Sequence, residues 1–152
     1  MQKMKKTINI GAYTLEIFPE ETRRQYEKMP PYAGNDVGQN FFRYLLPRAS
    51  AQSLAFLEEL GVVPEKLYLA RPLTEPDEKG EVLFFCACRI CAAVLAGGNT
   101  VPRQSEEAAG MSMVFLQDKR GFSQGLMSLP EPETELRFVI PLPFDAEFFK
   151  QF

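Results

Sequence analysis

The chain contains no histidine and no tryptophan, and only three of its 152 residues are cysteine. Without an imidazole, one chain cannot assemble Ser-His-Asp or Cys-His catalysis, or any metal site that uses histidine ligands. A zinc site normally needs four ligands, so the thiols would have to recruit carboxylates or a second chain. We therefore assign no catalytic residue and expect neither a metal nor another cofactor.

A strong excess of one charge and a long apolar run are also missing. Seventeen Lys and Arg against twenty Asp and Glu give a net charge of −3, which offers no attraction to nucleic acid or to an anionic membrane. The longest apolar run, residues 82–96, is interrupted by Arg89 and is shorter than the about 20 residues of a transmembrane helix. Residues 1–10 carry lysines but no apolar signal-peptide core. With an odd number of cysteines, these absences predict a soluble, cytoplasmic protein without nucleic acid or membrane as partner.

The length and composition that remain are typical of one folded unit. Hydrophobic residues make up 45% of the chain and charged residues 24%, which are ordinary values for a globular protein. A chain of 152 residues can bury one core without dividing into two. We expect a single globular domain over residues 1–152.

The hydrophobic pattern predicts strands, then helices, then mostly strands. Apolar residues alternate on either side of Gly11-Ala12, which indicates a β-hairpin with Ile8, Ile10, Leu15 and Ile17 facing the core. Pro19 opens one helix, and Ser50 can cap another that ends at Gly61. Further strand-like runs follow at residues 81–85, 111–116, 122–126 and 136–140. This order favours an α+β fold, with a mainly antiparallel sheet and helices packed on one face.

One turn gives a specific pairing prediction. Asp118-Lys119-Arg120-Gly121 separates two strand-like runs and has the composition of a hairpin turn. We therefore expect residues 111–116 to pair antiparallel with residues 122–126.

All three cysteines lie in the segment Cys86-Ala87-Cys88-Arg89-Ile90-Cys91. If this segment is a strand, Cys86 and Cys88 share one face and Cys91 points to the other, so the thiols cannot meet at one metal ion. If the chain turns into a helix near Cys88, then Cys88 and Cys91 lie one turn apart, and the helix N-terminus lowers the pKa of the first thiol. The second geometry is that of a Cys-x-x-Cys redox site. Because free cysteine is among the most buried residue types, we predict that Cys86 and at least one other thiol are reduced core residues.

Two loops are candidates for ligand binding. Residues 30–38 combine two prolines and two glycines with polar side chains, and loops held by a rigid scaffold often carry function. A Gly-Gly pair after the cysteine segment could let the backbone approach a ligand, or simply end a helix. The candidate ligand-binding residues are Tyr32, Asn35, Asp36, Gly97, Gly98 and Asn99.

Three phenylalanines lie close together near residue 150, at Phe148, Phe149 and Phe152. Leaving each ring in water would cost about 1.5–3 kcal/mol. We expect them to pack on the core of their own chain or to form a homodimer contact.

Two functional hypotheses of different classes follow. The first is a small cytoplasmic, non-catalytic binding module whose partner is a protein or a small ligand. The alternative is a thiol-dependent redox or metal-linked protein that uses the Cys86-x-Cys88-x-x-Cys91 cluster, with Cys88 and Cys91 as the redox pair. Burial of the thiols distinguishes the two hypotheses, because a reactive cysteine must be accessible.

Overall fold

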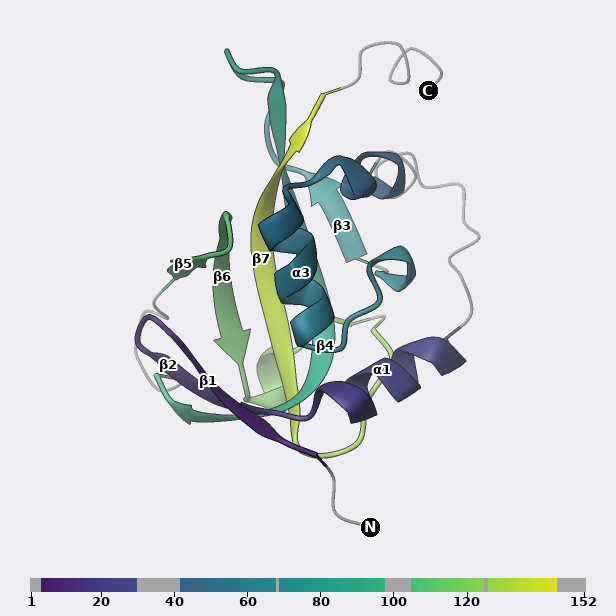
Figure 1. Ribbon diagram of the computed structural model, residues 1–152, viewed down its shortest axis with the longest axis vertical. Coiled ribbons are helices and arrows are strands. Elements are labelled where there is room, and N and C mark those ends of the chain that lie inside the picture. The colour runs from purple at the N-terminus through teal and green to yellow at the C-terminus, as the bar shows by residue number, and fades with distance from the viewer. Residues whose placement is uncertain (1–3, 30–41, 68, 98–104, 125, 145–152) are drawn as a thin grey trace.

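The computed structural model describes residues 4–29, 42–67, 69–97, 105–124 and 126–144. These residues form an antiparallel seven-stranded sheet in the order β1-β2-β4-β7-β6-β5, and β3 also pairs with β4. In Figure 1, helix α3 lies across the sheet and α1 lies beside it. The expected α+β fold, with a mainly antiparallel sheet and helices on one face, is confirmed.

The bounds of the elements are as follows. The strands are β1 (Lys6–Ile10), β2 (Tyr13–Ile17), β3 (Leu69–Pro72), β4 (Glu81–Ala96), β5 (Glu106–Ala108), β6 (Met111–Leu116) and β7 (Glu133–Pro143). The helices are α1 (Pro19–Lys28) and α3 (Ala51–Glu59), with short 3₁₀ helices η1 (Leu46–Arg48), η2 (Pro64–Lys66) and η3 (Lys119–Gly121). Residues 42–45 are also helical and lead into η1.

The N-terminal hairpin forms as the alternation predicts. Strands β1 and β2 pair around Gly11-Ala12, where Gly11 has a φ of +56° that glycine adopts without strain. Ile10, Leu15 and Ile17 are buried, and Ile8 packs half-buried against the same core.

The two long helices begin and end where the sequence indicates. Pro19 is the first residue of α1, where its missing N–H costs nothing. Ser50 caps α3, because its Oγ accepts a hydrogen bond from Ser53 N at 3.2 Å. Gly61 follows α3 with a φ of +89°, the left-handed conformation that commonly ends a helix.

Strand β4 is the central element of the sheet. Its first part pairs with β7 and β3, and its last residues pair with β2. Residues 81–96 are one continuous strand, so the alternative of a helix beginning near Cys88 is wrong. Long apolar runs without alternation form strands when both faces of the strand are covered, which is the case for residues 86–92.

The two faces of the sheet have different cover. We call the face that α1 and α3 pack against the inner face, and the opposite one the outer face. Alternation along β4 places Phe84, Cys86, Cys88 and Ile90 on the inner face and Leu83, Phe85, Ala87 and Arg89 on the outer face.

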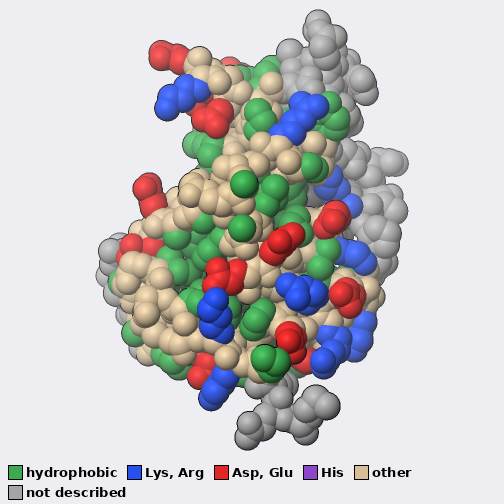
Figure 2. All heavy atoms as spheres, in the orientation of Figure 1, with side chains coloured by type: hydrophobic (Ala, Val, Ile, Leu, Met, Phe, Trp, Pro, Cys, Tyr) green, Lys and Arg blue, Asp and Glu red, His purple; other side chains and the backbone are tan. Residues whose placement is uncertain are grey.

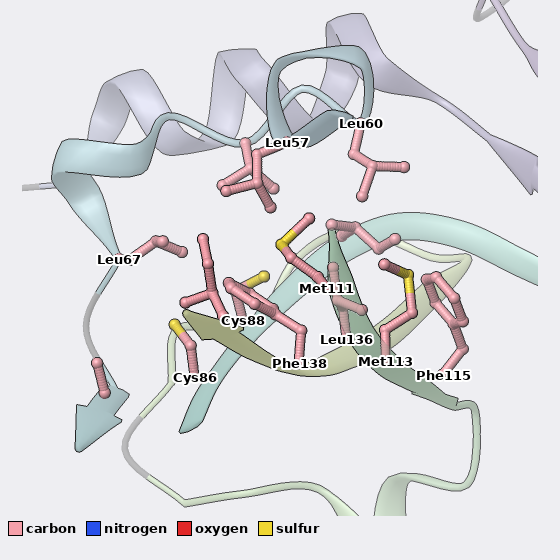
Figure 3. Packing of buried hydrophobic residues seen from close by; sticks show 14 of the residues in the cluster. Leu57, Leu60, Leu67, Cys86, Cys88, Met111, Met113, Phe115, Leu136 and Phe138 are labelled. Atoms are coloured by element: carbon pink, nitrogen blue, oxygen red, sulfur yellow. The ribbon is translucent and has the colours of Figure 1, made fainter. Parts of the chain in front are cut away.

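The core fills the space between the helices and the inner face. Figure 3 shows Leu57 and Leu60 near α3 pointing toward a layer that contains Cys88, Met111 and Phe138. All five side chains are at most 2% exposed. The buried apolar side chains of α3 therefore pack against the inner face of the sheet.

Helix α1 is tied to β4 by its own hydrogen bonds. The hydroxyl of Tyr26 donates to Arg89 O at 2.9 Å, and Cys91 N donates to Thr22 Oγ1 at 2.9 Å. Both bonds are buried. They fix α1 at the point along β4 where pairing with β7 ends, at Cys91, and pairing with β2 begins, at Ala92.

The predicted hairpin of residues 111–116 with 122–126 is wrong. The segment Lys119–Gly121 is a 3₁₀ turn capped by Asp118, whose Oδ1 accepts from Arg120 N at 3.0 Å. The residues described in 122–126 are not strand, and β6 pairs instead with β7 and β5. The polar cluster at 118–121 forms a local turn that starts a long connection rather than a hairpin.

The surface on the side of α3 is electrostatically mixed. Figure 2 shows acidic and basic side chains interspersed there, with apolar side chains between them. Among the residues coloured in that view, no broad patch of a single charge marks a footprint for nucleic acid.

Candidate functional site

The outer face is divided into a closed half and an open half. Residues 117–124 and 126–132, which we call the clasp segment, connect β6 to β7 and cover the closed half. Arg89, Glu135 and Leu116, which share one row of the outer face, are each at most 9% exposed. On the open half, Leu83 is 37% exposed and Phe85 is half-buried.

A buried ionic cluster lies beneath the clasp segment. Arg89 Nε is 3.2 Å from Glu135 Oε1, and Arg89 Nη1 is 3.2 Å from Glu133 Oε2. The register of β4 and β7 places Arg89 directly opposite Glu135. Arg137, two residues further along β7, donates from Nε to Glu135 Oε2 at 2.7 Å. We refer to Arg89, Glu133, Glu135 and Arg137 as the ionic cluster.

The ionic cluster holds the clasp segment on the sheet. Glu135 accepts from Ser123 N at 2.8 Å and from Ser123 Oγ at 2.9 Å. Glu133 accepts from Leu129 N at 2.6 Å. Arg89 donates from Nη2 to Ser123 O at 2.9 Å, and its guanidinium lies 4.4 Å from the centre of the Phe122 ring. Main-chain groups of the clasp segment are thus satisfied by charged side chains of the strands.

The electrostatics of the ionic cluster favour a structural role. Burial alone would raise the pKa of Glu135, but hydrogen bonds from Arg137 and Ser123 outweigh it and hold that pKa below its ordinary value. Two cations face two carboxylates, so the cluster is neutral as a whole. A carboxylate with four donors already bound and no exposed surface is poorly placed to act as a general base.

The open half carries two adjoining hollows. The first has a volume of about 540 Å³ and lies between Leu83, Pro141 and the β5–β6 turn. The second, of about 310 Å³, lies over Phe85, Val114 and Arg137. Val139 and Ser112 line both hollows, which therefore form one continuous apolar depression along β6, β7 and β4.

Besides Ser112 and Arg137, two charged side chains border this depression. Arg71 is exposed at the β3 side, with its guanidinium 5.2 Å from the centre of the Phe85 ring. Glu107 is exposed at the β5 side. Neither side chain makes an ion pair with a residue that the structure describes. One cation and one anion on opposite borders are thus available to a ligand.

Of the sequence-predicted ligand-binding residues, only Gly97 can be placed. Gly97 follows β4 with a φ of +90°, and a Cβ there would lie 2.6 Å from Ala12 O. The glycine therefore allows close approach to the β1–β2 turn, which is a packing role. The other candidates, Tyr32, Asn35, Asp36, Gly98 and Asn99, lie outside the described residues.

The cysteines are core residues, as predicted. All three are buried, and none is joined in a disulfide. Burial raises the pKa of Cys88 to about 12 and also raises that of Cys86. Because Cys88 and Cys91 are three apart on one strand, they point to opposite faces and do not form the helix-start geometry of a Cys-x-x-Cys site.

Sequence reasoning missed the ionic cluster and the open half. A lone Arg89 inside an apolar strand was the available signal, because a buried guanidinium needs carboxylate partners. The sequence Glu133-Thr134-Glu135-Leu136-Arg137 places three charges on one strand face. Only the pairing of β4 with β7 shows that these charges meet.

Among the described residues, no group of three or more acidic, cysteine or histidine side chains could hold a metal ion. In the same part of the chain, every helix is too short or too polar to cross a membrane. No family model, curated protein or solved structure matches this chain.

Proposed function

We propose that the protein is a small, non-catalytic interaction module that binds its partner on the open half of the outer face. The observation that carries this proposal is the continuous apolar depression floored by Phe85, Val114 and Val139. These three side chains are half-buried, whereas the neighbouring row of the same face, beneath the clasp segment, is at most 9% exposed. An apolar surface left open beside a covered one is typical of an interaction site.

The scaffold suits binding better than catalysis. The floor consists of hydrogen-bonded strands, and the ionic cluster holds the adjoining clasp segment. Preorganised surfaces lose little entropy when they bind. Among the described residues at the border, Arg71 and Glu107 are the charged side chains without an ion pair, and the hydroxyl of Ser112 is hydrogen-bonded to that of Ser105 rather than to a base.

A protein segment fits the depression better than a small molecule does. The two hollows adjoin along the strands instead of closing around one compact volume, whereas small-molecule sites bury most of their ligand. In this proposal the partner lays apolar side chains along β4 and β7. Homodimerisation through Phe148, Phe149 and Phe152, which lie outside the described residues, and a cytoplasmic location are further parts of the proposal.

The thiol-dependent alternative has weaker support. A redox cysteine must be accessible and carry a lowered pKa, whereas Cys88 is 2% exposed and has a raised pKa. Thiol chemistry would therefore need β4 to open.

Site-specific crosslinking tests the proposed function. A photoreactive p-benzoylphenylalanine replaces Phe85 in the full chain, and a control chain carries it at Phe56, which is half-buried on α3. We expect one partner protein to be trapped from position 85 and not from position 56. The adduct should disappear when Val139→Asp is added. Equal trapping from both positions, or none from position 85, would overturn the proposal.

A further inference from the structure

We propose that the partner docks in the depression with an amphipathic α-helix whose axis follows the strands. This inference rests on the proposed function and names the kind of segment that the partner presents. The helix turns an apolar face to the sheet, with a carboxylate on one flank and a basic side chain on the other. The width of the depression, the spacing of its two hollows and the charges on its borders specify such a helix.

The depression is several strands wide. The register aligns one residue from each of β3, β4, β7, β6 and β5 in a single row across the outer face, namely Arg71, Phe85, Val139, Ser112 and Glu107. Neighbouring strands lie about 4.8 Å apart, so the backbones at the two charged ends of this row are roughly 19 Å apart, and β4, β7 and β6 span roughly 10 Å between them. A helix with its side chains is about 10–12 Å across and fills that width. A single extended segment covers about one strand spacing and would leave most of the floor in water.

The two hollows follow one another at a spacing that a helix can match. The first hollow lies between the row of Leu83 and Pro141 and the row of Val139, and the second lies between the row of Val139 and the row of Arg137 and Val114. Successive rows on one face of a strand are about 6.8 Å apart. Residues i and i+4 of a helix are separated by about 6 Å along its axis. Two large apolar side chains on successive turns can therefore enter the two hollows, on either side of Val139.

The inner face of the same sheet already carries a helix in this orientation. In Figure 1, the axis of α3 follows the direction of β7 on that face. A helix layered on a sheet is one of the few stable ways to bury an apolar sheet face. On the outer face, the clasp segment limits the docked helix at one end, because Leu116 borders the second hollow and is only 4% exposed. At the other end, Leu83 is 37% exposed and leaves room for further turns.

The charges on the borders determine the flanks of the helix. Arg71 is exposed on the β3 side and Glu107 on the β5 side, and neither makes an ion pair within the described part of the chain. Because both lie in the row of Val139, they face the same part of the docked helix from opposite sides. Charge complementarity then requires a carboxylate on the flank near β3 and Lys or Arg on the flank near β5. A helix docked in the reverse direction would bring like charges together, so the two borders also select one direction.

Selection from a peptide library tests the inference with the full chain. The probe is a phage-displayed library of random peptides of about 16 residues, long enough for four helical turns, and the Val139→Asp chain removes peptides that bind elsewhere. We expect the enriched peptides to carry apolar residues at i, i+3 or i+4 and i+7, and to gain helical circular dichroism on binding. Apolar residues at alternate positions without a gain of helix would mean that the occupant is extended. That result, or the absence of any enriched peptide, would overturn the inference.

Exchange of the border charges provides a second test that leaves the apolar floor intact. Arg71→Glu combined with Glu107→Arg alters two exposed side chains and keeps the net charge. We expect an enriched peptide to bind this chain about tenfold more weakly, and the same peptide with its acidic and basic residues exchanged to recover the affinity. Glu27→Lys combined with Lys28→Glu is the matched control, because both residues are exposed on α1, and it should bind each peptide as the wild type does. Equal affinity of both peptides for the wild type and the border-exchanged chain would refute the assigned flanks.

Failure of this inference and failure of the proposed function give different results. In the crosslinking experiment, mass spectrometry locates the segment that is trapped from position 85. A partner trapped through a segment with alternating apolar residues, or a second copy of this chain, keeps the proposed function and overturns the docked helix. Enriched helical peptides that respond to the charge exchange, without any partner trapped from position 85, keep the preference of the depression for a helix and remove the proposed function.

Discussion

Glu135→Gln should destabilise the protein by about 3–5 kcal/mol, the range measured when one partner of a buried ion pair is removed. The carboxylate accepts from Arg89, Arg137 and twice from Ser123, and it has no exposed surface. An amide keeps the shape of the side chain but replaces one acceptor with a donor, so at least one charge-assisted hydrogen bond worth about 1.5–3 kcal/mol is lost. The side chain of Arg89, only 10% exposed, then keeps Glu133 alone as a carboxylate partner.

Urea denaturation at pH 7 measures this change in the free energy of unfolding. A domain of this kind is stable by about 5–15 kcal/mol, so the variant should remain folded and its transition should move to lower urea. Glu59→Gln is the matched control, because the Lys6–Glu59 pair is 58% and 41% exposed. Exposed pairs contribute at most about 1 kcal/mol. If Glu135→Gln cost no more than this control, the ionic cluster would not be what holds the clasp segment.

The same variant should change the pH dependence of stability. The pKa of Glu135 is lowered in the folded protein, so its contribution is complete above the ordinary value of about 4.3 and is lost as the pH falls through the folded pKa. The difference in stability between the wild type and Glu135→Gln should therefore shrink between pH 5 and pH 3. A constant difference over that range would contradict the assignment.

Three further outcomes test other parts of the structure. The native thiols should react with iodoacetamide at pH 8 more than about a hundredfold more slowly than in the denatured chain, because burial raises the pKa of Cys88 to about 12. Cys88→Ser should lower the free energy of unfolding by about 1–3 kcal/mol, since it buries a hydroxyl in an apolar layer; an unchanged melting temperature would contradict this. Gly97→Ala should cost at least about 1–3 kcal/mol, because of its positive φ and the contact with Ala12 O. Gly80→Ala is its control, having a φ of +74° but no atom within 4 Å of the added Cβ, and a larger loss for the control would refute the packing role of Gly97.

The sequence correctly predicted those helices and strands whose positions are set by residues close together in the chain. The alternation around Gly11-Ala12, the proline at the start of α1 and the Ser50 cap of α3 each concern residues within a few positions of one another. Their geometry is set by backbone conformation and by short-range hydrogen bonds, so the sequence contains the necessary information. The same applies to the burial of the cysteines, which followed from their apolar neighbours.

Elements that depend on distant partners were predicted less well. The turn at residues 118–121 was real, but the strand expected after it was not, because β6 finds its partner beyond the clasp segment in β7. Strand β7 begins at Glu133 and not at the predicted residue 136. The prediction began too late because acidic residues such as Glu133 and Glu135 are not expected in a buried strand. Charged residues are normally exposed, and nothing near Glu133 or Glu135 in the sequence reveals that Arg89 lies across from them.

Arg89 also determines how β4 aligns with its neighbour. Every other residue in 82–96 is apolar, so sliding the strand by one position against β7 would still present an apolar surface on both sides. Such a slip moves every side chain to the opposite face. The guanidinium would then enter the layer of Cys88 and Ile90 without a carboxylate, and Glu135 would lose its cation. In a strand whose hydrophobicity is nearly uniform, one buried cation therefore specifies the register of pairing. A shifted register is unfavourable because it leaves the cation of β4 and the carboxylate of β7 buried without each other as partners.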